Sequence, residues 1–136
     1  MARASRVEIT HNDFPKMGPE LRRAADREAE ITARSILSGA QIAMSEPKHG
    51  REYPRGDTVH IASAPGEAPA VDTGALRASG YVKQVQPGTW EVGFTAEYAA
   101  ALEFGTPRIE PRPYLRPEVE KHRDGFMGAI RRPVGQ

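Results

Sequence analysis

The stretch LRASGYVKQVQPGTWEVGF, residues 76–94, decides the fold class of this chain. Small or apolar residues recur at every second position on both sides of a central turn, at Leu76, Ala78, Gly80, Val82, Trp90, Val92 and Phe94. Pro87 and Gly88 occupy the turn between the two runs. Two alternating runs joined by a Pro-Gly turn are typical of an antiparallel β-hairpin, so we predict a small sheet here.

A long helix is predicted before this hairpin. Residues 20–46 contain no proline and only one glycine, Gly39, and Pro19 stands where a first helical residue tolerates proline. The helix is expected to end near Ser45, because Pro47 cannot continue the hydrogen-bond ladder. A narrow, alanine-rich stripe recurs at helical spacing, at Leu21, Ala25, Ala29, Thr32, Ile36 and Ala40. Opposite charges recur at i,i+4 spacing in Arg22–Asp26 and Glu30–Arg34.

Two further helices are predicted after the hairpin. Thr95 is expected to cap a short helix over residues 96–104, which Gly105 ends. A passage with regularly spaced prolines follows, and a last helix is expected over residues 117–131. The apolar face of this last helix recurs at helical spacing, at Leu115, Val119, His122, Phe126 and Ile130.

Together these elements predict an α+β fold, in which a long N-terminal helix and a C-terminal helix pack on a small antiparallel β-sheet. Residues 47–74 hold four prolines and four glycines, and we expect them to form an extended arm with a short strand at 59–62. We predict a single domain over residues 15–131, preceded by a flexible arm at 1–14 and followed by a flexible tail at 132–136.

The composition excludes several classes of function. Nineteen basic and eighteen acidic residues give a net charge of +1, whereas a dedicated nucleic-acid binder usually carries a marked basic excess. The chain has no cysteine, which rules out disulfides, thiolate nucleophiles and cysteine-ligated zinc. No apolar run approaches the roughly 18 residues of a membrane span, and no signal peptide is recognised, so we expect a soluble protein made in the cytoplasm.

One motif is compatible with catalysis. The sequence DTGA at residues 72–75 also occurs in retroviral-type aspartic proteases, where each subunit of a dimer supplies one of the two carboxylates that activate water. Those enzymes are all-β barrels in which the motif follows a buried strand, whereas Pro65 and Pro69 precede it here. The same residues also suit a turn, in which the aspartate bonds the backbone two residues further on.

We expect neither a metal nor a cofactor. The four histidines are scattered, and none has a second ligand at the spacing of a zinc protease. The chain also lacks a phosphate-binding glycine loop, a dinucleotide fingerprint and a Gly-x-Ser-x-Gly elbow. Arg108, Arg112 and Arg116 recur in the proline-rich passage, where they suit either solvated surface charge or contacts with phosphate or an acidic partner.

Six phrases occur in order along the chain. They are YPRG at 53–56, ASAPGEAPA at 62–70, VDTGALRAS at 71–79, VGF at 92–94, YAAALEFGT at 98–106 and PRPYLRP at 111–117. In this combination they resemble the small neck and tail-component proteins of long-tailed phages and prophages, the gp-ten-like family of HK-type lambdoid phages. The resemblance covers residues 15–130, and one departure is Gly80, where the family usually has a β-branched residue.

The resemblance implies a structural protein and not an enzyme. Family members lie at the head–tail junction of the virion, where they join or complete the tail as a homo-oligomeric ring, commonly six-fold. The implied partners are further copies of the chain and the neighbouring head-completion, tail-terminator or tail-tube proteins. DNA would pass through the ring without sequence-specific binding, and no membrane is implied.

The implied location is the neck or tail of the virion, after synthesis in the cytoplasm of the host bacterium. Two alternatives stay open at this point. The first is a dimeric aspartic protease that uses Asp72-Thr73-Gly74. The second is a neck component that contacts DNA, whose binding would depend steeply on salt.

The matched residues are expected to have structural roles. Asp72, Thr73 and Gly74 would turn the arm into the hairpin, and the pair GT at 105–106 would release the chain into the proline-rich passage. The anchors of the short helix on the sheet would be Tyr98, Leu102 and Phe104.

Ring-forming contacts need two different patches on each subunit. The arm at 47–74 is the first expected patch, and the segment 103–115 is the second. The full set of candidate interface or structural residues is Tyr53, Pro65, Gly66, Pro69, Asp72, Thr73, Gly74, Leu76, Tyr98, Glu103, Phe104, Gly105, Thr106, Pro113, Tyr114 and Leu115.

Overall fold

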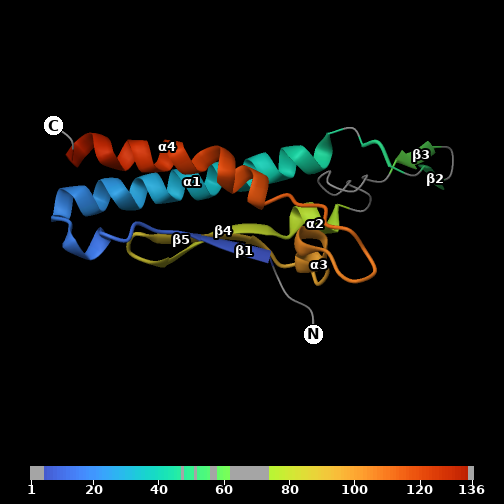
Figure 1. The fold of residues 1–136 in the computed structure, drawn as a ribbon, viewed down its shortest axis with the longest axis horizontal. Helices are drawn as coiled ribbons and strands as arrows, with labels where there is room; N and C mark the ends of the chain where they lie inside the picture. The colour runs from blue at the N-terminus through green and yellow to red at the C-terminus, as the bar shows by residue number, and fades with distance from the viewer. Residues whose placement is uncertain (1–4, 47, 51, 56–57, 62–73, 135–136) are drawn as a thin grey trace.

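A three-stranded antiparallel sheet carries the two long helices on one of its faces (Figure 1). The computed structural model describes residues 5–46, 48–50, 52–55, 58–61 and 74–134. In chain order the elements are β1 (Ser5–Ile9), the 3-10 turn η1 (Phe14–Lys16), α1 (Pro19–Ser45), β2 (Glu52–Arg55), β3 (Thr58–Ile61), α2 (Ala75–Ala78), β4 (Gly80–Gln86), β5 (Thr89–Phe94), α3 (Ala99–Phe104) and α4 (Arg116–Val134). The predicted α+β fold is therefore confirmed.

The predicted hairpin supplies two strands of the sheet. Strands β4 and β5 pair around the turn at Pro87 and Gly88, and β1 pairs with the other side of β5, so the strand order is β1-β5-β4. Val7, Val92 and Val82 lie side by side across the three strands. Val92 is fully buried, and the other two valines pack against the core, so this row belongs to the face beneath the helices.

Helix α1 packs across the sheet with an alanine-rich face. Gly18 is its N-cap residue and Pro19 its first residue, and the helix ends at Ser45, as predicted. The buried positions are Ala25, Ala29, Ala33, Ile36, Ala40 and Met44. Ala33, and not the predicted Thr32, therefore continues the stripe in the middle of the helix. Small side chains along this face let the helix backbone approach the sheet closely.

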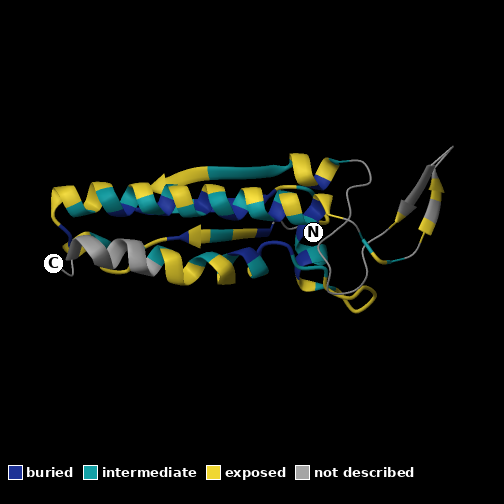
Figure 2. Ribbon diagram, turned by 90° about the horizontal axis from the view of Figure 1, so that it is seen from above, coloured by how far each residue is buried: buried dark blue, intermediate teal, exposed yellow. Residues whose placement is uncertain are grey.

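Helix α4 runs antiparallel to α1 and beside it (Figures 1 and 2). The two helices approach closely at Gly39, where a Cβ would collide with the carboxylate of Glu118. That carboxylate is buried, and its Oε2 atom accepts a hydrogen bond of 2.8 Å from Lys121 Nζ. The single glycine of α1 is thus explained by a close approach, which a side chain at this position would prevent.

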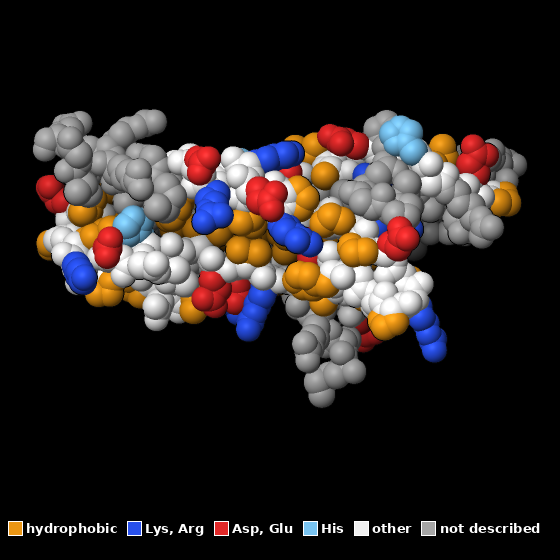
Figure 3. Space-filling view, viewed as in Figure 1, with side chains coloured by type: hydrophobic (Ala, Val, Ile, Leu, Met, Phe, Trp, Pro, Cys, Tyr) orange, Lys and Arg blue, Asp and Glu red, His pale blue; other side chains and the backbone are white. Residues whose placement is uncertain are grey.

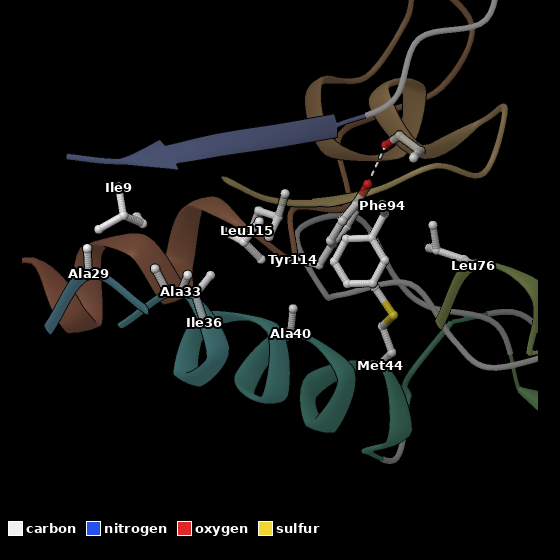
Figure 4. Packing of buried hydrophobic residues seen from close by; sticks show 12 residues of the cluster. Ile9, Ala29, Ala33, Ile36, Ala40, Met44, Leu76, Phe94, Tyr114 and Leu115 are labelled. Atoms are coloured by element: carbon white, nitrogen blue, oxygen red, sulfur yellow. Dashed lines mark hydrogen bonds between the residues drawn. The ribbon is translucent and has the colours of Figure 1, made fainter. Parts of the chain in front are cut away.

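The core lies between α1, the sheet and the start of α4 (Figure 4). The rings of Phe94 and Tyr114 meet edge to face in it, with centroids 5.0 Å apart and an interplanar angle of 89°. The buried cluster consists of Ile9, Ala29, Ala33, Ile36, Ala40, Met44, Leu76, Val92, Phe94, Ala99, Tyr114 and Leu115. Both ends of the chain therefore contribute to one core.

The N-terminal segment differs from the expectation of a flexible arm at residues 1–14, because strand β1 lies within it. Ser5 and Ile9 are buried, Val7 is half-buried, and Arg6 and Glu8 are exposed. This alternation is that of a sheet strand with one covered face. It covers five residues and begins with a polar serine, so the sequence pattern was too short to predict a strand.

The first residues of the predicted hairpin form the short helix α2 instead, and β4 begins only at Gly80. Ser79 Oγ donates a hydrogen bond of 2.8 Å to the carbonyl of Leu76 and so closes this helical turn. A Cβ on Gly80 would lie 2.6 Å from Leu37 Cδ1, which is closer than carbon atoms approach. A β-branched residue at this position would therefore displace the side chains of Leu37 and Phe94 beneath α1.

The predicted arm contains a second hairpin, formed by β2 and β3. Their antiparallel register runs from Glu52 opposite Ile61 to Arg55 opposite Thr58. The hairpin lies beyond the end of α1 and away from the sheet (Figures 1 and 2). Strand β3 corresponds to the short strand predicted at 59–62, shifted by one residue. Residues 62–73 of the arm lie outside the described part of the chain.

Candidate functional site

Glu103, on α3, caps the first turn of α4. Its Oε1 atom accepts hydrogen bonds from the backbone N–H groups of Tyr114 at 3.2 Å and Leu115 at 2.8 Å, and its Oε2 atom accepts one from Arg116 at 3.3 Å. The side chain is buried, with 2% of its residue surface exposed. The first amides of a helix have no partner within the helix, and a carboxylate is their strongest acceptor. Glu103 thereby fixes α4 to α3.

Tyr114 ties the same region to the N-terminal strand. Its hydroxyl donates a hydrogen bond of 2.7 Å to the carbonyl of Ala99 (Figure 4) and is also hydrogen-bonded to the hydroxyl of Ser5. Because a phenol has one proton, Ser5 acts as the donor in the second bond. Burial of the phenol raises the pKa of Tyr114 far above its ordinary value. The ring and its hydroxyl therefore lock β1, α3 and the start of α4 together.

Residues 105–115, the connector, join α3 to α4 and fold back on α3. Gly105 has a φ of +76°, as expected for the residue that ends a helix. The N–H of Thr106 donates to the carbonyl of Ile109 at 2.9 Å, and the N–H of Arg112 donates to the carbonyl of Leu102 at 2.6 Å. The proline-rich passage is therefore a folded turn and not simply an extended release of the chain.

Large apolar side chains of this region face outward. Phe104 is 66% exposed, Tyr98 is 46% exposed and Ile109 is 39% exposed. The expectation that Tyr98 and Phe104 anchor the short helix on the sheet is therefore wrong, whereas Leu102 does pack against the core. Ala99 and Glu103 occupy the buried side of α3, one turn apart, and this leaves Phe104 facing solvent.

The predicted start and cap of α3 are also corrected. The helix begins at Ala99, its N-cap residue is Tyr98, and no side chain caps it. Thr95 bonds elsewhere, since its N–H donates to the carbonyl of Ser79 at 3.2 Å. The N–H of Ala96 likewise donates to Ser79 Oγ at 3.1 Å, so these residues hold the end of β5 to the start of β4.

An apolar hollow of about 310 Å³ lies between β1 and the start of α4. We call it the edge hollow, because β1 is an outer strand of the sheet. It is lined by Ser5, Arg6, Val7, Glu103, Phe104, Leu115, Arg116 and Val119. Figure 3 shows apolar side chains reaching the surface where the start of β1, α3 and the start of α4 meet. The hollow therefore adjoins the most exposed aromatic side chain of the described residues.

The sheet face opposite the helices carries a polar cluster that the sequence did not predict. Tyr81 donates a hydrogen bond of 2.6 Å to the buried carboxylate of Glu91, and Arg6 and Lys83 lie 3.6 Å and 3.5 Å from the same carboxylate. The bond from Tyr81 lowers the pKa of Glu91, while burial opposes this shift. Burial and the neighbouring carboxylate raise the pKa of Tyr81 to about 12. Gly93 makes the cluster possible, because a Cβ there would lie 2.8 Å from the Tyr81 hydroxyl.

Asp26 is the second polar centre that sequence reasoning missed. Its Oδ1 atom accepts hydrogen bonds from Gln84 Nε2 at 2.9 Å, the N–H of Gly88 at 2.7 Å and Trp90 Nε1 at 3.1 Å. The expected pair with Arg22 is replaced by these bonds, and Arg22 Nη2 donates to the carbonyl of Pro15 instead. The other expected pair, Glu30–Arg34, forms at 2.8 Å. Asp26 therefore fixes the hairpin turn against α1.

The candidate residues fall into separate groups in space. Glu103, Phe104, Gly105, Thr106, Pro113, Tyr114 and Leu115 come together around α3 and the connector. Leu76 is buried in the core, and Gly74, with a φ of +80°, precedes α2. Tyr53 lies in β2 opposite His60. The remaining candidates, Pro65, Gly66, Pro69, Asp72 and Thr73, lie outside the described residues.

Among the described residues, no group of three or more His, Cys, Asp or Glu side chains is arranged to hold a metal ion. No helix in that part of the chain has the length and apolar character needed to cross a bilayer. Comparison of the chain with protein-family models, with curated proteins and with solved structures gives no match. The sequence motifs and the geometry around α3 and the connector are therefore the features that bear on function.

Proposed function

We propose that this chain is a structural protein of a tailed phage or prophage that joins or completes the tail at the head–tail neck, as a homo-oligomeric ring. The observation that carries the proposal is the contrast between neighbouring residues of the matched phrases. Glu103, Tyr114 and Leu115 are buried and hydrogen-bonded, whereas Phe104, next to Glu103 in the chain, is largely exposed. A rigid frame thus presents an apolar side chain to solvent.

Exposed apolar surface of this kind is typical of a protein–protein contact. Tyr98, Phe104 and Ile109 all belong to α3 or its flanking turns, and all three are exposed. Aromatic residues are enriched at protein interfaces, and large exposed apolar patches are uncommon on monomers. The near-balance of charge, with a net charge of +1, supports a role in protein contacts more than direct binding of DNA.

A ring also requires two different patches on each subunit, because its contacts are head-to-tail. The surface around Phe104 is one, and the β2–β3 hairpin, which projects beyond α1, is the other (Figure 2). The protease alternative receives less support, since its fold is an all-β barrel, whereas α1 and α4 span 27 and 19 residues here.

The test is deletion of the gene from the phage or prophage that carries it, followed by electron microscopy of the lysate. We expect filled heads and separate tails, with joined particles restored by a plasmid copy of the chain. The variant Phe104→Asp is expected to fail in this complementation. Ile31→Asp, at a 52% exposed isoleucine on α1, is the matched control and is expected to restore joining.

Normal joined virions in the deletion strain would contradict the proposal. A second measurement addresses the alternative directly. Unfolded casein is incubated with the purified chain at acid pH, beside the variant Asp72→Asn. Cleavage that depends on Asp72 would overturn the structural role in favour of the protease.

A further inference from the structure

Among the described elements, none packs closely on the β2–β3 hairpin. Among the described residues, β2 and β3 contact each other extensively, and neither makes comparable contact with another element. Figures 1 and 2 show the hairpin beyond the end of α1, away from the three-stranded sheet. An isolated two-stranded hairpin is at best marginally stable in water. A hairpin in this position therefore needs a second surface to pack on.

The two outer edges of this hairpin differ in their hydrogen-bonding capacity. Pro54 lies in β2 opposite Val59, and the register continues unbroken on both sides of it. Since proline has no N–H and is tolerated where its nitrogen faces away from the partner strand, the outer edge of β2 lacks a donor. Strand β3 contains no proline, so its outer edge keeps its full set of donors and acceptors.

The three-stranded sheet offers a matching open edge. Strand β1 pairs with β5 on one side only and contains no proline. The other outer strand, β4, is interrupted by an irregularity in register between Gln84 and Gln86, which weakens continuous pairing. The edge hollow lies beside β1, so a strand added there would place a side chain against Val7, Leu115 and Val119.

One acidic residue of the hairpin, Glu52, and one basic residue of the edge hollow, Arg116, have opposite charges. Ile61, which is 40% exposed, lies directly opposite the exposed Glu52 in the register of β2 and β3. The apolar side chain and the acidic side chain therefore lie on the same face of the hairpin. The edge hollow is apolar and has Arg116, which is exposed, among its lining residues. Arg6 also borders the hollow, but its guanidinium lies near Glu91 on the opposite face of the sheet. An apolar side chain with an acidic neighbour therefore fits this hollow.

We propose that β3 of one copy of the chain adds to the free edge of β1 of the next copy, with Ile61 in the edge hollow and Glu52 near Arg116. This inference deepens the ring proposed above and rests on it. The contact joins two different patches, so it is head-to-tail, and repetition of it closes a ring or continues as a filament. Each subunit then donates one hairpin and accepts one.

Cysteine cross-linking tests the contact, because the chain has no cysteine of its own. In Phe104→Cys/Ile61→Cys, mild oxidation with copper phenanthroline is expected to give a ladder of covalent multimers. Mixing the two single variants is expected to give covalent dimers and nothing longer. Ile42→Cys/Ile61→Cys, which uses a 59% exposed isoleucine of α1, is the matched control and is expected to stay near background.

A charge exchange adds a second measurement. Glu52→Arg and Arg116→Glu are each expected to lower the cross-link yield several-fold, and their combination is expected to restore it. Circular dichroism of each variant checks that it is folded. A cross-link yield for the Phe104/Ile61 pair no higher than that of the Ile42/Ile61 pair would overturn the inference, as would a failure of the combined exchange to restore the yield.

These readouts are separate from the test of the neck function. If the chain forms cross-linked multimers but its deletion leaves virions normal, the β3–β1 contact is supported and the neck function is contradicted. If deletion abolishes joined virions but no Phe104/Ile61 cross-link forms, the neck function is supported and the β3–β1 contact is contradicted.

Discussion

The Oε1 atom of Glu103 lies 2.8 Å from the backbone nitrogen of Leu115, so a side chain of α3 holds the first turn of α4. Most N-caps are short polar residues next to their helix. Here the capping carboxylate precedes α4 by more than ten residues, and the intervening connector must fold back for it to reach. The cap therefore links helix stability to the shape of the connector.

Replacement of Glu103 is expected to destabilise the protein strongly. Glu103→Ala leaves the buried N–H groups of Tyr114 and Leu115 without an acceptor, and we expect a loss of about 3 kcal/mol in the free energy of unfolding. Glu103→Gln keeps one acceptor oxygen and is expected to lose about half as much. Urea unfolding followed by circular dichroism measures both. Equal stability of the alanine variant and the original chain would contradict the capping role.

Tyr114 and Ser5 are expected to behave as a coupled pair. Tyr114→Phe removes the hydroxyl that bonds Ser5 and the carbonyl of Ala99, at an expected cost of about 1–2 kcal/mol. Ser5→Ala removes one of the same bonds. The double variant should therefore lose less than the sum of the two single losses, which a double-mutant cycle in urea detects. Strict additivity would show that the two hydroxyls do not interact.

Asp26 is expected to control the environment of the only tryptophan in the chain. Asp26→Ala removes the acceptor of Trp90 Nε1 and of the Gly88 N–H, with an expected loss of about 2 kcal/mol. The tryptophan emission should shift as well, because the indole loses its partner. Glu30→Ala is the control, since its exposed pair with Arg34 should contribute about 0.5 kcal/mol or less and leave emission unchanged.

The effect of Gly39→Ala on stability is expected to change sign when Glu118 is also replaced. Alanine is a better helix former than glycine by about 1 kcal/mol, yet Gly39→Ala should destabilise by about 1–2 kcal/mol because it displaces the buried Glu118 carboxylate. In a Glu118→Ala background the obstacle is absent, and the same change should stabilise the protein. Thermal unfolding of the four chains measures this. A stabilising effect in both backgrounds would show that the helices approach less closely than described.

The Tyr81–Glu91 cluster predicts pH dependence at both ends of the scale. The pKa of Glu91 is lowered on folding, so its contribution to stability is present above its ordinary value of 4.5 and is lost as the pH falls below it. The pKa of Tyr81 is raised from 10.0 to about 12, so its contribution is present below pH 10 and is lost as the pH rises through 12.

Ultraviolet titration of tyrosine ionisation checks the alkaline part of this prediction. A titration step near pH 12 should disappear in Tyr81→Phe, whereas Tyr98→Phe should leave it in place. On the acid side, Glu91→Gln should flatten the decline of stability below pH 4.5. Ionisation of Tyr81 near pH 10 would contradict the hydrogen bond with the carboxylate.

The parts of the fold that the sequence predicted are those with local signals. Helix α1 has Pro19 at its start, Pro47 after its end and a continuous apolar stripe, so its bounds follow from neighbouring residues. The hairpin likewise follows from period-two alternation around Pro87 and Gly88. Strand β1 has only five residues, and its partner β5 lies far along the chain, so no local pattern defined it.

The site could be predicted less fully, for a similar reason. The resemblance drew attention to Glu103, Phe104 and Tyr114, but their orientations depend on how α3 packs. Burial of Ala99 against the sheet decides which side of this six-residue helix faces outward, and that contact is tertiary. Asp26 was expected to pair with Arg22 four residues away, whereas hydrogen bonds from the distant hairpin turn take its place.

The hydrogen bond between Ser5 and Tyr114 spans 109 residues, and the walls of the edge hollow come from both ends of the chain in the same way. A ribosome releases the first strand long before it releases the start of α4. The surface proposed to accept a neighbour's hairpin does not exist until the start of α4 has left the ribosome, and long-range pairing of this kind is slow to form. A nascent chain that has not yet reached α4 cannot accept a hairpin, which protects such chains on one messenger from premature association.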